Sequence, residues 1–213
     1  MKKITFFVIA SLITISVFSQ EKNNISGNSY KCNIGFGGGI GYYQGTSNEE
    51  NSKKDTAACA IIKLHFDYSV IKNLAIGFSF ERNGFFTNKD SSDKASSLNL
   101  GLSFKIKFIS REFNSLYLDI MPAYSYFTYQ KETNNQIDKI KSNGYNFQVG
   151  LGWDHYFGDH LGMYLGTYYT LYRYSEIIDA SNDEILQVNY PQEDFKVTFS
   201  GMNFLKLGLL YRF

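Results

Sequence analysis

Three histidines are the side chains of this sequence best suited to acid–base chemistry near neutral pH. They are His65, His155 and His160. The last two stand beside Asp154 and Asp159, and this mixture of nitrogen and oxygen donors could ligate a divalent metal ion. Polar residues that flank a turn explain the same cluster more simply. The choice depends on where the fold places each side chain.

An acidic stretch near the C-terminus could attract Ca²⁺ or a cationic partner, because no basic residue lies within it. Its acids are Glu176, Asp179, Asp183, Glu184, Glu193 and Asp194. A solvated surface loop explains them more simply.

The elements that must position these residues are strands. After residue 20 no segment has a convincing helical period. Apolar and polar residues instead alternate with a period of two, which is typical of a strand with two unlike faces. Leu98, Leu100 and Leu102, for example, alternate with polar or small residues. Eight such segments occur, at 31–44, 57–70, 74–83, 97–108, 115–129, 144–156, 161–174 and 196–213.

The connections between these segments alternate in length. Short turns follow the second, fourth and sixth segments, whereas the others are long and polar, as at 46–56, 88–97, 131–143 and 175–194. This alternation predicts an all-β fold, an eight-stranded antiparallel up-and-down transmembrane β-barrel with short turns at one end and long loops at the other. Within the last loop, Ile178 and Ile185 belong to apolar runs, which predict that the strands at 161–174 and 196–213 extend beyond the membrane as a protruding hairpin. Pro122 predicts a bulge or a missing hydrogen bond in the fifth strand.

The apolar face of this barrel is expected to contact lipid. It carries more large side chains than the narrow interior of eight strands holds. The opposite face is rich in glycine, as at Gly150 and Gly152, which relieves crowding inside a narrow barrel. Aromatic rings of the apolar face gather near strand ends, as they do at membrane–water interfaces. They include Tyr42, Tyr68, Phe108, Tyr126, Tyr145, Trp153 and Tyr211.

The first residues have the pattern of a secretory signal peptide. Lys2 and Lys3 precede an uncharged apolar run at 4–18, and small residues then favour cleavage after Ser19. We therefore expect a signal peptide at 1–19, a short polar periplasmic segment at 20–30 and the barrel domain at 31–213. Loss of the two lysines changes 21 basic and 20 acidic residues to 19 and 20. This near-neutral balance argues against general attraction to nucleic acid.

The C-terminal strand carries the most specific signal. Phe213, Tyr211 and Leu209 alternate with residues of the other face and end the chain on an aromatic ring. This pattern resembles the C-terminal signature that the barrel-assembly machinery recognises in bacterial outer-membrane barrels. With the strand pattern, it makes the mature chain resemble the small OmpA/OmpX-type barrel domains, in a porin-like family. The resemblance implies a monomer in a Gram-negative outer membrane, surrounded by lipid and lipopolysaccharide.

The face opposite the apolar one is predicted to place a network of charges in the lumen. Its members are Lys63, His65, Asp67, Glu81, Lys105, Lys107, Asp119, Asp154 and Lys206. Pairing Val70 with Leu74 around the turn at 71–73 sets Lys63 opposite Glu81. Pairing Phe108 with Leu116 around the next short turn sets Lys105 opposite Asp119. Facing charges of opposite sign would stabilise these registers and plug the lumen.

The expected positions of the histidines argue against catalysis, a cofactor or a metal. Barrel enzymes that modify lipid A hold a histidine near the outer rim, whereas His65 is expected in mid-barrel and the other two histidines near a periplasmic turn. Cys32 and Cys59 are expected near opposite ends of the barrel, well beyond the ~7 Å between Cα atoms that a disulfide allows.

We therefore expect an integral outer-membrane barrel with a structural or surface-interaction role, and the partner of its long loops is unknown. A narrow porin-like channel for small solutes is the alternative. A lipid-modifying enzyme is the third hypothesis.

Overall fold

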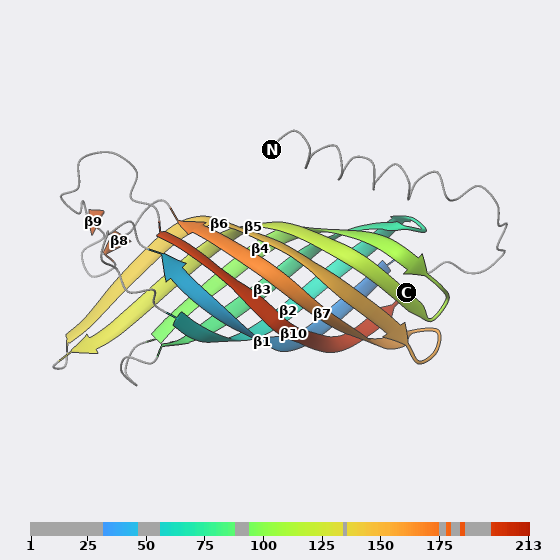
Figure 1. Cartoon of the computed structure of the whole chain (residues 1–213), viewed down its shortest axis with the longest axis horizontal. Helices are drawn as coiled ribbons and strands as arrows, with labels where there is room; N and C mark the ends of the chain where they lie inside the picture. The colour runs from blue at the N-terminus through green and yellow to red at the C-terminus, as the bar shows by residue number, and fades with distance from the viewer. Residues whose placement is uncertain are drawn as a thin grey trace.

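The computed structural model forms a closed antiparallel barrel whose strands are strongly tilted (Figure 1). The structure describes residues 32–46, 56–87, 94–133, 136–174, 178–179, 184–185 and 197–213. The expected signal peptide at 1–19 and the segment at 20–30 lie outside these ranges. Among the described residues, no helix has the length and apolarity needed to cross a membrane.

Eight long strands form the wall of the barrel. They are β1 (Cys32–Thr46), β2 (Thr56–Ile71), β3 (Leu74–Thr87), β4 (Lys94–Ser110), β5 (Asn114–Thr133), β6 (Gln136–Tyr156), β7 (Leu161–Tyr174) and β10 (Val197–Arg212). Each pairs with its neighbour in sequence, and β1 pairs with β10 to close the wall. The predicted eight-stranded up-and-down barrel is confirmed.

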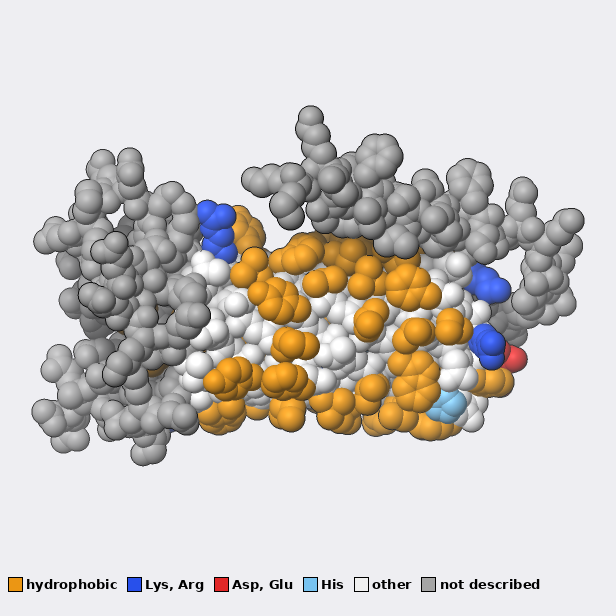
Figure 2. Space-filling view, in the orientation of Figure 1, with side chains coloured by type: hydrophobic (Ala, Val, Ile, Leu, Met, Phe, Trp, Pro, Cys, Tyr) orange, Lys and Arg blue, Asp and Glu red, His pale blue; other side chains and the backbone are white. Residues whose placement is uncertain are grey.

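The alternation of side chains gives the barrel a polar interior and an apolar exterior. Phe78 is 69% exposed on β3, whereas Glu81, three residues further along the same strand and on the other face, is 1% exposed. Figure 2 shows the hydrophobic side chains as a broad band along the wall, with lysine and arginine at its ends. Because apolar side chains on a water-exposed surface would be unfavourable at this density, this wall is suited to a lipid environment.

The predicted registers hold along the strands and fail beside the turns. Lys63 faces Glu81 and Lys105 faces Asp119, as predicted. Next to the first turn, however, Ile71 rather than Val70 pairs with Leu74. Next to the second, Ile109 rather than Phe108 pairs with Leu116. In both hairpins a bulge of one residue beside the turn absorbs the difference.

The hairpin of β5 and β6 is longer than predicted, because both strands continue through most of the expected loop at 131–143. A ribbon outside the membrane has water on both faces, so its sequence needs no apolar alternation. Two short strands, β8 (Ile178–Asp179) and β9 (Glu184–Ile185), pair with each other. β8 also pairs with β6, Ile178 with Lys141 and Asp179 with Ile140. Because Tyr174 of β7 pairs with Gly144 of β6, β8 continues β7 along the same strand after a shift of one residue, which is the course predicted for the first strand of the protruding hairpin.

Pro122 interrupts the ladder between β4 and β5, as predicted. Gly101 pairs with Ala123 and Phe104 with Ile120, but the two residue pairs between them are missing from the ladder. Proline has no N–H to donate, so the gap is a missing hydrogen bond and not a bulge. The register is unchanged across it.

The first and last strands of the barrel, β1 and β10, pair with each other where the wall closes. Cys32 and Phe213 exchange backbone hydrogen bonds of 3.3 and 3.0 Å. Phe213, Tyr211 and Leu209 all point outward from this closing strand. Cys32 and Cys59 are both free, as expected from their separation along the barrel.

Candidate functional site: the lumen network

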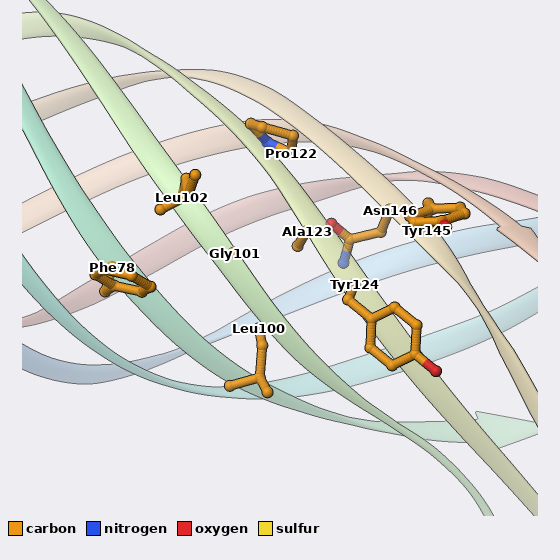
Figure 3. Close-up of a pocket in the computed structure, with 9 residues that line it drawn as sticks. All are labelled: Phe78, Leu100, Gly101, Leu102, Pro122, Ala123, Tyr124, Tyr145 and Asn146. Carbon is orange, nitrogen blue, oxygen red and sulfur yellow. The ribbon is translucent and has the colours of Figure 1, made fainter.

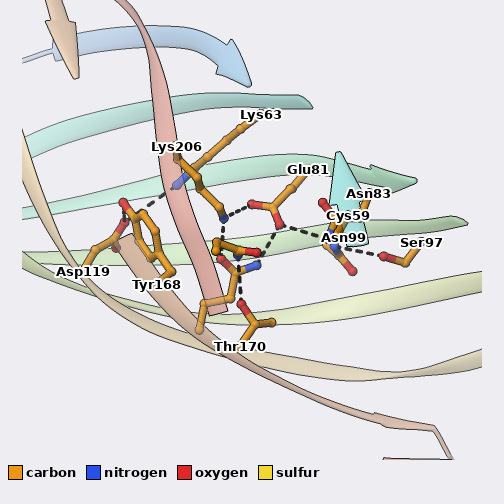
Figure 4. A network of polar contacts seen from close by, with 12 residues as sticks. Cys59, Lys63, Glu81, Asn83, Ser97, Asn99, Asp119, Tyr168, Thr170 and Lys206 are labelled. Atoms are coloured by element: carbon orange, nitrogen blue, oxygen red, sulfur yellow. Dashed lines mark hydrogen bonds and ion pairs between the residues drawn. The ribbon is translucent and has the colours of Figure 1, made fainter. Parts of the chain in front are cut away.

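Side chains from β3, β6 and β10 meet inside the barrel, and Figure 4 labels two of them, Glu81 and Lys206. Lys206 Nζ on β10 lies 2.5 Å from Glu81 Oε2 on β3 and donates to Gln148 Oε1 on β6 at 2.8 Å. Gln148 Nε2 donates to Glu81 Oε1 at 3.0 Å. All three are buried. This closed triangle therefore ties together strands that are not neighbours in the wall.

A second ion pair lies beside this triangle. Lys63 Nζ is 3.8 Å from Asp119 Oδ2, and Asp119 also accepts a 2.7 Å hydrogen bond from Ser103. The ring of Tyr168 lies under two ammonium groups, 5.1 Å from Lys63 and 4.5 Å from Lys206. Because ring faces attract cations, Tyr168 keeps the two lysines in one layer despite their like charge.

A third group lies nearer the short-turn end. Lys105 Nζ donates to Asp67 Oδ2 at 2.7 Å and lies 4.7 Å from the centre of the Tyr117 ring. Tyr117 in turn donates to Asp154 at 2.9 Å. Lys107 is only half-buried and donates to Ser69 at 3.1 Å. In this group, the charges of Lys105 and Asp67 thus partner each other, and the Asp154 carboxylate is partnered by the Tyr117 hydroxyl.

His65 lies in the lumen, with its Nε2 3.5 Å from Asp67 Oδ2, but neither ring nitrogen makes a hydrogen bond. The nearby hydroxyls of Ser79 and Tyr164 are also buried and without hydrogen-bond partners. Ser79 faces His65 across the ladder, and the His65 and Tyr164 rings are 5.0 Å apart.

The ion pairs of the lumen differ from those that the register implied. Lys63 faces Glu81 in the ladder but pairs with Asp119, and Glu81 pairs with Lys206 instead. Lys105 likewise pairs with Asp67 rather than with the facing Asp119. Long side chains that point into a narrow lumen reach residues across it as easily as residues beside them. The expectation of facing ion pairs was wrong for this reason.

An aromatic layer covers the network at the long-loop end. Tyr43, Tyr172 and Tyr174 point inward and are buried, and Phe85 and Phe127 pack against them. The Tyr172 and Tyr174 rings stack with centres 6.0 Å apart. Tyr172 also accepts a 2.5 Å hydrogen bond from Asn83, which joins this aromatic layer to the charges beneath it.

Arg212 closes the lumen at the other end. Its guanidinium donates to the backbone carbonyls of Glu112 at 2.6 Å, Asp159 at 2.5 Å and Gly158 at 3.1 Å. It also lies 4.1 Å from the centre of the Tyr156 ring. One side chain of the closing strand thus connects two short turns at this end of the barrel.

Sequence reasoning missed Arg212 and the inward tyrosines. The signal for the tyrosines was present, because Tyr164 and Tyr168 share parity with Gly162 and Gly166, which lie on the inward face. The tyrosine rings also explain why glycines are needed on the inward face, because they occupy the space that larger side chains would fill. A Cβ added at Gly150 would overlap the ring of Tyr168.

The other candidate residues do not form a site. Asp154 is buried in the lumen, whereas its neighbour His155 lies on the outer face, where it contacts Asn114 at 2.9 Å. His160 lies 2.9 Å from the Arg212 carbonyl and stacks on Tyr211. Among the described residues, no group of three or more potential ligands could hold a metal ion. Most of the acidic loop lies outside the described ranges.

The fold and this interior define a small barrel of the outer-membrane class. No family model matches the sequence, and no curated protein does. Solved structures share the fold. Neisserial surface protein A matches with a TM-score of 0.52 and 11% identity over 85% of this chain and 97% of its own.

Two further solved structures are similar. The outer-membrane protein AlkL, solved in lipid bilayers, has a TM-score of 0.53 and 16% identity over 91% of this chain and 96% of its own. OprG from Pseudomonas aeruginosa has a TM-score of 0.50 and 12% identity over 89% and 99%. At these identities the likeness establishes the fold, an outer-membrane β-barrel.

Proposed function

We propose that the protein is a monomeric, non-catalytic barrel of the outer membrane with a sealed lumen, and that its role is structural or is exerted by its long loops at the cell surface. The observation that carries this proposal is the triangle of Lys206, Glu81 and Gln148 across the lumen. The aromatic layer at one end and Arg212 at the other support it. In this proposal residues 1–19 direct export and are removed.

The proposal is tested by single-channel recording of the purified barrel in planar bilayers, with an open porin as the positive control. A sealed lumen predicts no stable conductance steps. Reproducible ohmic steps from the wild-type protein would contradict it.

Transport of a small solute is the second candidate. Both ring nitrogens of His65 and the hydroxyls of Ser79 and Tyr164 lack hydrogen-bond partners in the lumen. Buried polar groups of this kind are commonly satisfied by water. The same recording distinguishes the two functions, because a water-filled path through the lumen would conduct ions.

A further inference from the structure

A hollow of about 460 Å³ opens on the lipid-facing wall beside Pro122 (Figure 3). Its sides are the outward-facing Phe78 and Leu100 and the rings of Tyr124 and Tyr145. Small residues, Gly101 and Ala123, lie at its base, so the space between the large side chains stays open. This hollow belongs to the outer wall and is separate from the lumen network.

The ladder gap supplies a hydrogen-bond acceptor at this hollow. The unchanged register sets Leu102 opposite Pro122, and the missing pairs are Leu102 with Pro122 and Ser103 with Met121. This is the pattern expected when the lost hydrogen bond is the one from residue 122 to the Leu102 carbonyl. That carbonyl has no ladder donor, because proline has no N–H. In a membrane no water compensates such a group, so a ligand donor would be bound favourably.

A second polar group without a partner lies at the base. Asn146 is 3% exposed and lines the hollow, and neither atom of its carboxamide makes a hydrogen bond. Figure 3 shows this carboxamide turned toward Ala123. The hollow therefore combines apolar sides with an acceptor and an amide.

The position of the hollow indicates what occupies it. Beyond Tyr145, the next outward residues of β6 toward the long loops are Asn143 and Lys141, so the apolar band ends there. The rings of Tyr124 and Tyr145 are 6.2 Å apart at this border. A lipid of the outer leaflet would have its polar group at this level and its acyl chains beside Pro122.

We propose that the hollow binds a hydroxylated acyl chain of an outer-leaflet lipid, whose hydroxyl donates to the Leu102 carbonyl. The chain packs against Phe78 and Leu100. This inference is independent of the proposed function, because a sealed barrel and a channel would present the same outer wall.

Leu102–Ser103 is the single Leu–Ser dipeptide of the sequence, which makes a site-specific test possible. Barrel labelled with ¹³C-carbonyl leucine and ¹⁵N-serine gives one carbonyl–amide NMR correlation for this position. In lipid bicelles, the methyl ester of β-hydroxylated tetradecanoic acid should move the Leu102 carbonyl resonance downfield in a saturable manner. The ester without the hydroxyl group should not. No shift, or the same shift with both esters, would overturn the proposal.

Three variants test which residues of the hollow the shift depends on. Pro122→Ala supplies the missing N–H and should abolish the hydroxyl-dependent shift. Tyr145→Ala should weaken binding roughly fivefold, as expected for one lost aromatic contact. Tyr169→Ala is the matched control, because Tyr169 is also lipid-facing, at 48% exposed, but lies outside the hollow. An unchanged shift in Pro122→Ala, or equal weakening by both tyrosine variants, would also overturn the proposal.

Discussion

At the residue scale, Glu81 is the side chain through which the central part of the lumen is connected. It pairs with Lys206 and accepts hydrogen bonds from Gln148 and Asn83. A charge at 1% exposure depends on such partners, because burial removes the water that would otherwise stabilise it. The network therefore behaves as one unit rather than as separate ion pairs.

Removing the Glu81 carboxylate should leave Lys206 buried without a counter-charge. We expect Glu81→Ala to lower the free energy of unfolding by roughly 3–5 kcal/mol. The double variant Glu81→Leu with Lys206→Met should be destabilised less than the single one. Urea unfolding of the refolded barrel in lipid vesicles measures both. Glu112→Ala at an exposed turn is the control, and equal stabilities of Glu81→Ala and this control would show that the pair is solvated.

The inward glycines give a second prediction at this scale. A Cβ at Gly150 meets the Tyr168 ring and the Thr167 carbonyl, whereas nothing lies within 4 Å of one at Gly158. Gly150→Ala should therefore be destabilising by roughly 1–3 kcal/mol, the usual cost of overpacking. Gly158→Ala should be close to wild type in the same unfolding measurement. A neutral Gly150→Ala would mean that Tyr168 moves freely away from this wall.

At the element scale, the strands are specified by two different kinds of pattern. Where the wall lies between lipid and lumen, its residues alternate, and prediction and structure agree. The outer half of the β5–β6 hairpin has no such contrast, so the sequence suggested a loop there. At Pro122, by contrast, a single residue without an N–H is enough to break the ladder between β4 and β5, and no repeating pattern is involved.

The closing strand β10 carries a prediction about assembly. Phe213 is 55% exposed on the lipid-facing side and its backbone pairs with Cys32, where the barrel closes. Deleting Phe213, or Phe213→Asp, should reduce the amount of folded barrel in the membrane and leave export unchanged. Phe157→Asp, at an exposed turn of the same end, is the control. If both substitutions gave the wild-type yield, the terminal residue would not be an assembly signal.

At the scale of the whole molecule, the wall has its apolar side chains outside and its charges inside. This distribution is stable only when lipid or detergent covers the band, because a soluble protein would bury those side chains. The interior is held by contacts between strands distant in the barrel, such as those of Lys206 with Glu81 and Gln148. The barrel should consequently unfold as one unit.

We therefore expect the mature protein to fractionate with the outer membrane. On gels it should migrate as a compact form when unheated and as an unfolded form after boiling, because closed barrels resist detergent at room temperature. Fractionation followed by paired heated and unheated samples tests this. Recovery of the protein from the periplasm without detergent would contradict the lipid-facing assignment.

The sequence by itself determined the number of strands, their order and the face that each residue occupies. Period-two alternation indicates that the two faces of a strand lie in different environments, and this holds wherever the wall separates lipid from lumen. It also determined the pairing of Lys63 with Glu81 and of Lys105 with Asp119 in the ladder, because short turns leave few possible registers.

Only the tertiary structure decided which of these charges form ion pairs. Neighbouring strands constrain Cα positions, but long side chains in a narrow lumen choose partners across the barrel, so Glu81 pairs with Lys206 and Lys63 with Asp119. The closure by Arg212 likewise depends on backbone carbonyls of turns about 50 and 100 residues away in sequence. Such contacts arise when the barrel closes, and no local pattern in the chain encodes them.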